Sequence, residues 1–482
     1  MDMVKRFKVL SAVLLIIALV IAGCGSSGGN NAGGTEQSSN GGNGGGAEGA
    51  KNESANSGGK TEGVTLTVAT VNNPDMKIMQ KLTPEFEKQT GIRINYVVLP
   101  ENDLRKQVTM DVSSGAGKFD IVTIGTYDTP IWAKNGWIAD VDQFFASMPD
   151  AEKQAYDLED IFPVIRDALS YEDKLYAIPF NAESSLLFYN KEKLEKAGVE
   201  MPKNPTWEQV AEAAKKAKAA NNEPGIIIRG LPGWGEMLAP VNTIINAFGG
   251  RWYDENWNAT MDSPETVAAI KFYVDLLAAA GQPGATTTGF TEALTLMQQG
   301  KAAMWYDATT AAGFLEDPNS STISGKVGYA LAPSQAKDKN GWLWSWALGI
   351  EAASKNKEAA FKFVTWATSK EYIKLVGESE GWVVAPAGTR KSTYENEDYK
   401  KAAPFAEITL EAMNSADFKK PTLKPVPYVG IQYVAIPEFQ QLGTEVSQDI
   451  AAAIAGNKTV EQAMKDAQAK AERVAVEGGY KK

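Results

Sequence analysis

The chain lacks histidine altogether and contains a single cysteine, Cys24, among its 482 residues. Without histidine there is no imidazole for general acid–base catalysis, for a Ser-His-Asp triad or for a metal site. One cysteine supports neither a disulfide framework nor a thiolate cluster. A basic stripe is also missing, and the formal net charge is -11, so we expect no nucleic-acid partner. We therefore expect a protein without a metal site or a cofactor.

Residues 1–23 have the organisation of a secretory signal peptide. Three basic residues (Lys5, Arg6, Lys8) precede an apolar run over residues 9–22, which is too short to span a membrane comfortably. The run ends in Ile-Ala-Gly-Cys, which matches the lipobox of bacterial lipoproteins. We expect Cys24 to carry a diacylglycerol anchor and to become the mature N-terminus; a buried structural cysteine in an N-terminal helix is the alternative.

Residues 25–63 are dominated by Gly, Ser and Asn and contain no aromatic side chain. Such a segment buries too little apolar surface to fold, so we expect a flexible tether. A Gly-rich coil of this length has a root-mean-square reach on the order of 35 Å, which would hold a folded domain clear of a bilayer.

One stretch stands out in the rest of the chain. Residues 119–125 form a run of apolar and β-branched side chains that ends at a glycine, which indicates a buried parallel strand. Thr126, Tyr127 and Asp128 follow directly. Ligands of open α/β sheets bind beyond the carboxyl ends of the strands, so these residues are placed to meet one. A capped helix start, with Pro130 in its first turn, is the alternative interpretation.

The segments before this strand alternate between strand and helix patterns: strands over 66–71 and 92–99, and helices over 74–89 and 104–114. This β-α-β-α-β order predicts a parallel sheet with right-handed crossovers. Asn72 and Asn73 lie at the carboxyl end of its first strand.

Later segments continue as a second α/β unit, and the length of the chain favours two or three domains. A carboxylate, Glu183, lies between two strand patterns and needs an explanation. The expected strands are 175–180, 185–189, 226–228, 302–305, 327–331 and 342–350. The expected helices are 191–197, one from 206, 236–248, 264–280 capped by Ser263, 291–299, two from 357 and 371, 437–455 and 460–476.

All twelve tryptophans follow the tether, and nine lie at position 234 or later. The C–H faces of sugars and polyols pack on aromatic rings, while their hydroxyls bind charged partners such as carboxylates and guanidinium groups. Core packing is the alternative for any single tryptophan. Trp234, Asp307, Trp344 and Trp382, each beside a glycine or a strand end, together favour a carbohydrate-like ligand.

The lipobox, the tether and the α/β pattern together resemble the extracellular solute-binding proteins (family 1, maltose-binding-like) of carbohydrate ABC importers. The resemblance covers essentially the whole chain. Several stretches are most similar to the sorbitol/mannitol-binding branch: VNNPDMKIMQKLTPEFE, FDIVTIGTYDTPIWAKNGWI, PFNAESSLLFYNKEKLEKAG, GWGEM, FGGRWYDENWN, GKAAMWYDAT and LWSWALGI.

The resemblance implies an α/β, two-lobed periplasmic-binding-protein-like fold with a ligand cleft between the lobes. Each lobe would contain a mostly parallel sheet flanked by helices. Lobe 1 is expected to comprise residues 64–180 and about 302–345, and lobe 2 about 181–301 and 346–480. The chain would cross between the lobes near 178–184, 302–307 and 342–347.

The resemblance also implies which residues meet the ligand. Glu183, Asp307 and Trp344 would lie on or beside the crossing strands that floor the cleft. The complete expected set is Asn73, Tyr127, Glu183, Arg229, Trp234, Asp307, Trp344 and Trp382.

The implied function is capture of a polyol such as sorbitol or mannitol, or a related sugar, for delivery to the permease subunits of an ABC transporter. We expect a monomer, not an enzyme, anchored through Cys24 on the outer face of a Gram-positive type of plasma membrane. Other mono- or oligosaccharides are alternative ligands. The rival class is a secreted glycosidase that uses Glu183 and Asp307 as its paired carboxylates, and a structural or adhesive surface protein is a third possibility.

Overall fold

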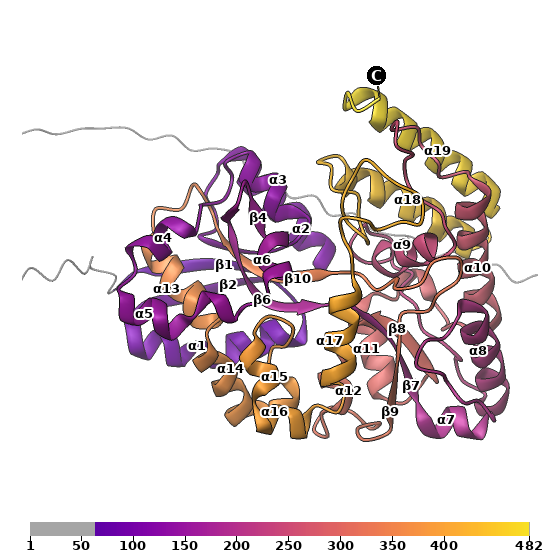
Figure 1. Ribbon diagram of the computed structural model, residues 1–482, viewed down its shortest axis with the longest axis horizontal. Helices are drawn as coiled ribbons and strands as arrows, with labels where there is room; N and C mark the ends of the chain where they lie inside the picture. Colours follow the sequence, from indigo (N-terminus) through magenta and orange to yellow (C-terminus); the bar gives the residue numbers. More distant parts are fainter. Residues whose placement is uncertain (1–62, 482) are drawn as a thin grey trace, which may run out of the picture. The chain divides into compact units, whose positions relative to one another are not determined.

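The computed structural model describes residues 63–481, and within them the chain forms two larger β-sheets, each covered by helices, and one two-stranded hairpin (Figure 1). The predicted signal peptide, Cys24 and nearly all of the predicted tether lie outside the described residues. The α/β class expected from the alternating strand and helix patterns is confirmed. Buried apolar side chains from both sheets join one contiguous core.

The first sheet has five strands in the order β2-β1-β3-β10-β6. Its strands are β1 (Thr65–Val71), β2 (Arg93–Leu99), β3 (Ile121–Gly125), β6 (Ala177–Glu183) and β10 (Trp344–Ile350). The first three strands are mutually parallel, as the β-α-β-α-β pattern predicts, whereas β10 runs antiparallel to both β3 and β6. The sheet is therefore mixed.

Helix α1 (Pro74–Thr90) begins and ends where the local sequence indicates. The side chain of Asn73 accepts a hydrogen bond from the Met76 amide at 2.9 Å, and Pro74 occupies the first helical position, where its missing N–H costs nothing. The helix ends at Gly91, which has a φ of 70° that glycine adopts without strain. The other helices around this sheet are α2 (Glu101–Ser114), α3 (Asp128–Lys134), α4 (Asp142–Ser147), α5 (Asp150–Tyr156), α6 (Pro163–Ala168), α13 (Lys357–Ala367) and α14 (Lys370–Val376).

The second sheet has three strands, β7 (Ser185–Asn190), β8 (Met304–Ala308) and β9 (Val327–Leu331), in the order β8-β7-β9. Both pairings are antiparallel, so the expectation of a mostly parallel sheet in the second lobe is wrong. The sequence of a buried apolar strand does not depend on whether its neighbours are parallel or antiparallel to it. The direction follows from how the strands are connected. The strand predicted over 226–228 is reduced to one parallel bridge between Ile227 and Trp305.

The strand pairing also changes the expected division of the chain. Strands β8 and β9 pair with β7 in the second sheet, so the expectation that 302–345 belongs to lobe 1 is wrong for these two strands. Strand β10 lies inside the first sheet, so the expectation that lobe 2 resumes at 346 is also wrong. After β10, α13 packs on β10, β6 and α1, so it belongs to the first lobe. The chain passes between the sheets at Ser184, between β9 and β10, and again before α17 (Ala406–Ser415), which packs on β7 and β9.

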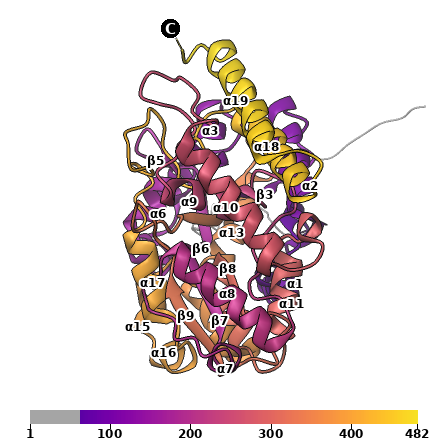
Figure 2. The same ribbon diagram turned by 90° about the vertical axis from the view of Figure 1, so that its right-hand side faces the viewer.

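Helices cover the side of the second sheet that faces away from the first. Figures 1 and 2 show α8 and α10 on this side, and these two helices contact each other. The predicted Ser263 cap of α10 is confirmed. The helices of this lobe are α7 (Lys191–Lys196), α8 (Trp207–Asn221), α9 (Leu238–Ala247), α10 (Pro264–Ala280), α11 (Phe290–Gln298), α12 (Ala311–Glu316), α17, α18 (Phe439–Ile454) and α19 (Val460–Glu477).

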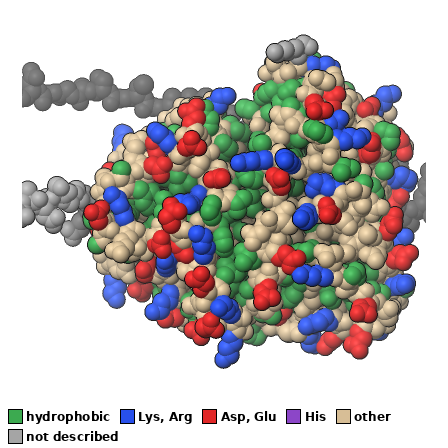
Figure 3. Space-filling model, viewed as in Figure 1, with side chains coloured by type: hydrophobic (Ala, Val, Ile, Leu, Met, Phe, Trp, Pro, Cys, Tyr) green, Lys and Arg blue, Asp and Glu red, His purple; other side chains and the backbone are tan. Residues whose placement is uncertain are grey.

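Short elements complete the described chain. They are the hairpin β4 (Ser170–Tyr171) and β5 (Lys174–Leu175), α15 (Lys391–Glu395), α16 (Glu397–Ala402), the 3-10 turns η1 (Leu158–Asp160), η2 (Ala285–Thr287) and η4 (Trp382–Val384), and the π-helical stretch η3 (Gly377–Gly381). On the face seen in Figure 3, basic and acidic side chains are interspersed, and no field of one sign covers it.

Arg390 ties the segment after η4 to the first lobe. Its side chain is fully buried, and its guanidinium group donates hydrogen bonds to the backbone oxygens of Thr368 and Tyr156, both at 3.0 Å, and to Asp160 at 3.2 Å. The guanidinium carbon also lies 4.6 Å from the centre of the Tyr156 ring. The third passage between the sheets therefore has a fixed starting point.

We expect Arg390→Met to lower the free energy of unfolding by about 3–5 kcal/mol, because it removes the nearer of the two cations at the buried Asp160, the other being Lys370 at 3.8 Å, and takes the donor away from two backbone oxygens. Arg473→Met is the matched control, since Arg473 forms an exposed ion pair with Glu445 and such pairs contribute less than about 1 kcal/mol. Urea titration of both variants measures the difference. Equal losses in the two variants would contradict this role for Arg390.

Candidate ligand-binding cleft

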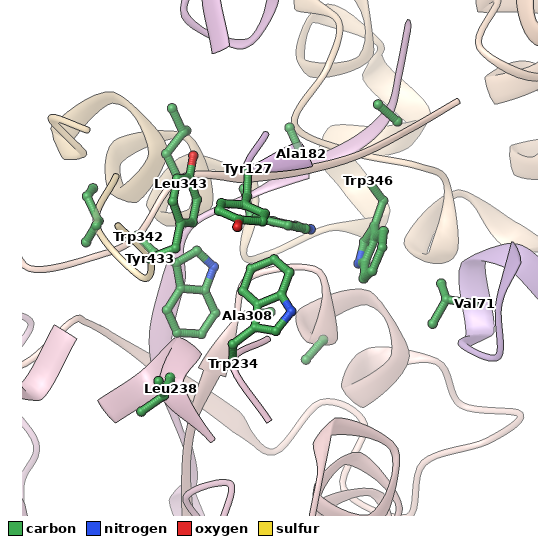
Figure 4. Packing of buried hydrophobic residues seen from close by; sticks show 14 of the residues in the cluster. Val71, Tyr127, Ala182, Trp234, Leu238, Ala308, Trp342, Leu343, Trp346 and Tyr433 are labelled. Atoms are coloured by element: carbon green, nitrogen blue, oxygen red, sulfur yellow. The ribbon is translucent and has the colours of Figure 1, made fainter. Parts of the chain in front are cut away.

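A cavity of about 200 Å³ lies between the two sheets, and residues from both lobes line it. Its floor is formed by side chains of β6 and β10. In the view of Figure 4, the indole rings of Trp234 and Trp346 lie between Val71 and Trp342, all four of which line the cavity. Ligand pockets for drug-sized molecules run from about 300 to 1,000 Å³, so this cavity fits a smaller molecule.

The register between β6 and β10 creates the floor. Trp344 pairs with Glu183, and Trp346 pairs with Asn181. Because side chains alternate between the two faces of a strand, residues 181 and 183 of one strand and 344 and 346 of the other project to the same face. Two polar and two aromatic side chains therefore lie side by side on the cavity floor. Trp342, two residues before the start of β10, also lines the cavity.

Arg105 of α2 lies against three indole rings. Its guanidinium carbon is 4.1 Å from the ring centre of Trp234 and 4.8 Å from those of Trp344 and Trp346, which are distances for cation–π attraction. One turn earlier on the helix, Glu101 accepts two hydrogen bonds from it, the shorter at 2.8 Å. This arrangement fixes the plane of the guanidinium group at the cavity wall.

Asp307 holds a second guanidinium group in place. Its two oxygens accept hydrogen bonds from Arg229 at 2.8 and 2.5 Å, and they also accept from the Trp305 indole at 3.0 Å and the Ala308 amide at 2.7 Å. Asp307 is completely buried and does not line the cavity. The expectation that Asp307 contacts the ligand is therefore corrected: its carboxylate positions Arg229, which does line the cavity.

Three buried carboxyl groups of the lining have unusual proton affinities. Burial raises the pKa of Asp75, Glu183 and Glu236 to about 7 in each case, because removal from water disfavours the charged form. Hydrogen bonds offset part of this effect: Asp75 accepts from the Asn181 amide at 3.0 Å, and Glu183 accepts from the Thr310 hydroxyl at 2.8 Å. The cavity therefore contains acidic groups that titrate near neutral pH.

Four buried polar atoms on the lining residues have no hydrogen-bond partner within the part of the chain that the structure describes. They are Nη1 of Arg105, Oδ1 of Asn181, Nε1 of Trp234 and Oε1 of Gln432. More than about 90% of buried polar groups in proteins are hydrogen-bonded. A polar molecule with both hydrogen-bond donors and acceptors, bound in this cavity, would provide the partners that these four atoms lack.

The structure brings together five of the eight side chains predicted to meet a ligand, namely Asn73, Glu183, Arg229, Trp234 and Trp344, which all line the cavity. Besides Asp307, two others do not. The hydroxyl of Tyr127 donates to the backbone oxygen of Ile436 at 2.9 Å, and its ring packs 4.5 Å from that of Trp234. Trp382 packs against Gly377. A tryptophan beside a glycine looks the same in the sequence whether it packs on protein or on ligand.

Several lining residues were not predicted. Asp75 and Glu101 lie in the first turns of α1 and α2, directly beyond the carboxyl ends of β1 and β2, and Arg105 lies one turn further along α2. The crevice rule that pointed to Asn73 applies equally to these turns, so it could have found them. No comparable signal points to Glu236 or to Gln432, because neither follows a regular strand.

Residues 63–481 contain no group of three or more Asp, Glu, Cys or His side chains placed to hold a metal ion. Within the same range, every helix is too short or too polar to cross a bilayer.

Comparison with known proteins gives consistent matches. Residues 70–374 match the family of bacterial extracellular solute-binding proteins. The mannitol-binding protein of Pseudomonas aeruginosa is 45% identical over 421 residues, which cover 87% of this chain and 94% of that protein.

Two crystal structures match nearly their full length. An ABC transporter solute-binding protein from Agrobacterium vitis with bound D-mannitol is 51% identical, with a TM-score of 0.83 over 86% of this chain and 99% of that chain. A solute-binding protein from Agrobacterium radiobacter in complex with ribitol is 26% identical, with a TM-score of 0.75 over 86% and 99%. The two-lobed fold expected from the sequence is thereby confirmed.

The raised pKa of Glu183 predicts how pH affects stability. The unfolded chain loses this proton near the ordinary pKa of 4.5, whereas the folded protein keeps it up to about 7, so stability falls as pH rises through this window. We expect the free-energy advantage of Glu183→Gln over the parent protein to grow by roughly 3 kcal/mol between pH 4.5 and pH 8. Urea titrations of the ligand-free proteins measure it. Glu212→Gln, on the exposed face of α8, is the control and should follow the parent; a constant Glu183→Gln difference would contradict the prediction.

Proposed function

Because the chain belongs to the family of bacterial extracellular solute-binding proteins, we propose that it captures an acyclic polyol such as mannitol or sorbitol and delivers it to an ABC permease. The observation that carries this proposal is the composition of the cavity. Indole rings, carboxylates and two fixed guanidinium groups converge on a space of about 200 Å³. Such a lining offers apolar surfaces to the C–H groups of a polyol and charged partners to its hydroxyls.

The proposed ligand contacts follow from the lining. Glu183 and Asp75 accept hydrogen bonds from hydroxyl groups, and Arg105 and Arg229 donate to hydroxyl oxygens. Trp234 and Trp344 pack on the carbon chain. The bound mannitol and ribitol in the related structures support a ligand of this size and class.

The proposed mechanism involves capture and closure without bond chemistry. The lobes open to admit the ligand and close around it, and the closed form is recognised by the permease. The hydrogen-bonding state of Asp307 supports this assignment over the glycosidase alternative, because both its oxygens are already occupied by Arg229, Trp305 and a backbone amide. A glycosidase needs two carboxyl groups that reach the glycosidic bond.

We further propose that the protein works as a monomer held at the outer face of the plasma membrane. The lipobox at Cys24 and the Gly/Ser-rich segment that follows it support an anchor and a tether. The family, whose members are extracellular, supports the location outside the cytoplasm.

Thermal unfolding of residues 64–482 tests the ligand class. We expect mannitol or sorbitol to raise the unfolding temperature strongly, because a ligand at a thousandfold excess over its Kd stabilises the folded state by roughly 4 kcal/mol. Maltose and glucose should leave it unchanged. A shift with the sugars alone would show that the ligand class is wrong, and no shift with any of these compounds would contradict the proposal as a whole.

Replacement of one lining carboxylate tests the site. Glu183→Ala removes a buried acceptor, and a hydrogen bond to a charged group contributes about 1.5–3 kcal/mol, so we expect the Kd for the hexitol to rise about 10- to 150-fold. Trp382→Ala is the control, because Trp382 does not line the cavity, and its Kd should stay within about twofold. Titration calorimetry of both variants gives the values. Similar effects of the two substitutions would argue against this site.

A further inference from the structure

The positive charges at the cavity are already neutralised within the protein. Arg105 pairs with Glu101 at 2.8 Å, and Arg229 pairs with Asp307 at 2.5 Å. Each arginine also has a second, longer carboxylate contact: Arg105 lies 3.7 Å from Asp128, and Arg229 lies 3.4 Å from Glu236. Each guanidinium group therefore has a carboxylate of its own.

Two buried carboxyl groups of the lining, those of Asp75 and Glu183, form no ion pair with any of residues 63–481. Asp75 and Glu183 are each 7% exposed. Their partners within residues 63–481 are neutral, the side-chain amide of Asn181 for Asp75 and the hydroxyl of Thr310 for Glu183. The charged groups that act on Glu183 from neighbouring elements are Arg229, Asp307 and Glu101, two of which are negative. This part of the cavity thus has an excess of acceptors and of negative charge.

Building on the proposed polyol function, we infer that the cleft selects its ligand by charge, with amino-polyols as a second class of ligand and carboxylated or phosphorylated polyols excluded. An amino-polyol carries a primary ammonium group in place of one hydroxyl. This group supplies three donors and a positive charge, and charge-assisted hydrogen bonds are roughly twice as strong as neutral ones. An anionic group at the same place would be repelled by these two carboxyl groups in their charged form, and the charges of both lining arginines are already balanced by Glu101 and Asp307.

The balance of protons supports this selectivity. The pKa of Asp75 and that of Glu183 are both raised to about 7 by burial, so each group is partly protonated in the ligand-free protein at neutral pH. When an ammonium group binds beside one of them, the carboxyl proton passes to the buffer and a carboxylate–ammonium pair forms. A neutral polyol carries no positive charge, so its binding releases fewer protons from these carboxyl groups.

A series of compounds with one carbon skeleton tests the inference. Sorbitol, D-glucamine and D-gluconate differ only at the first carbon, which carries a hydroxyl, an ammonium or a carboxylate group; mannitol, 1-amino-1-deoxy-D-mannitol and D-mannonate form a second series. Calorimetric titration of the protein at pH 7 should give a Kd for the amine equal to or below that of the hexitol, down to about tenfold. The carboxylate should bind at least about 100-fold more weakly. Titrations in phosphate and in Tris should show more proton release for the amine than for the hexitol.

Isosteric variants identify the groups responsible. Glu183→Gln and Asp75→Asn remove the charge and keep the shape, so the ratio of the hexitol Kd to the amine Kd should fall by about tenfold in at least one of them. Glu212→Gln should leave the ratio unchanged. Any of three results would overturn the inference: the amine binds much more weakly than its hexitol, the anion binds as well as the hexitol, or the ratio of the two Kd values is unchanged in both variants. Failure of the hexitol itself to bind would instead overturn the proposed function.

Discussion

The pairing of β6 with β10 places every group on the floor of the cavity. Its register opposes Glu183 to Trp344 and Asn181 to Trp346, and a slip of β10 by one residue would turn both tryptophans to the other face of the sheet, away from Glu183 and Asn181. Strand β6 also continues through Ser184 into β7, the central strand of the second sheet. One continuous backbone therefore belongs to both sheets and carries Glu183 at the junction, so a change in the angle between the lobes acts directly on the floor of the site.

The order of the elements is readable from local sequence, but their pairing is not. Asn73, Pro74 and Gly91 mark the ends of α1 through capping and backbone preferences, and periodicity finds most of the strands. The direction of β8 and β9 depends on where distant segments meet, and apolar runs such as 302–305 are compatible with either direction. This is why the sequence placed these strands in the first lobe, whereas they pair with β7.

The site shows the same limit at the level of single residues. The rule that ligands bind beyond the carboxyl ends of strands found Asn73, and the resemblance to a family pointed to Arg229 and Asp307. The sequence does not show that both oxygens of Asp307 accept hydrogen bonds from Arg229, because the two residues are 78 positions apart in the chain. Pairs of this kind contribute little net stability when buried. Their effect here is geometric, since a guanidinium group that is fixed during folding need not be ordered when a ligand binds.

The N-terminal part of α2 connects the site to the contact between the lobes. Arg105 stacks on Trp234 of the other lobe, and Asn102 donates a hydrogen bond to the backbone oxygen of Pro232 at 3.0 Å. Gly235 makes this approach sterically feasible, because a Cβ there would lie 2.6 Å from Nε of Arg105. These contacts form only when the lobes meet, so they favour the closed arrangement with or without ligand. A ligand shifts the equilibrium only by its differential affinity for the two arrangements. Each contact that favours closure in the ligand-free protein lowers the free energy that the ligand must supply to close the lobes. These contacts therefore lower the measured Kd.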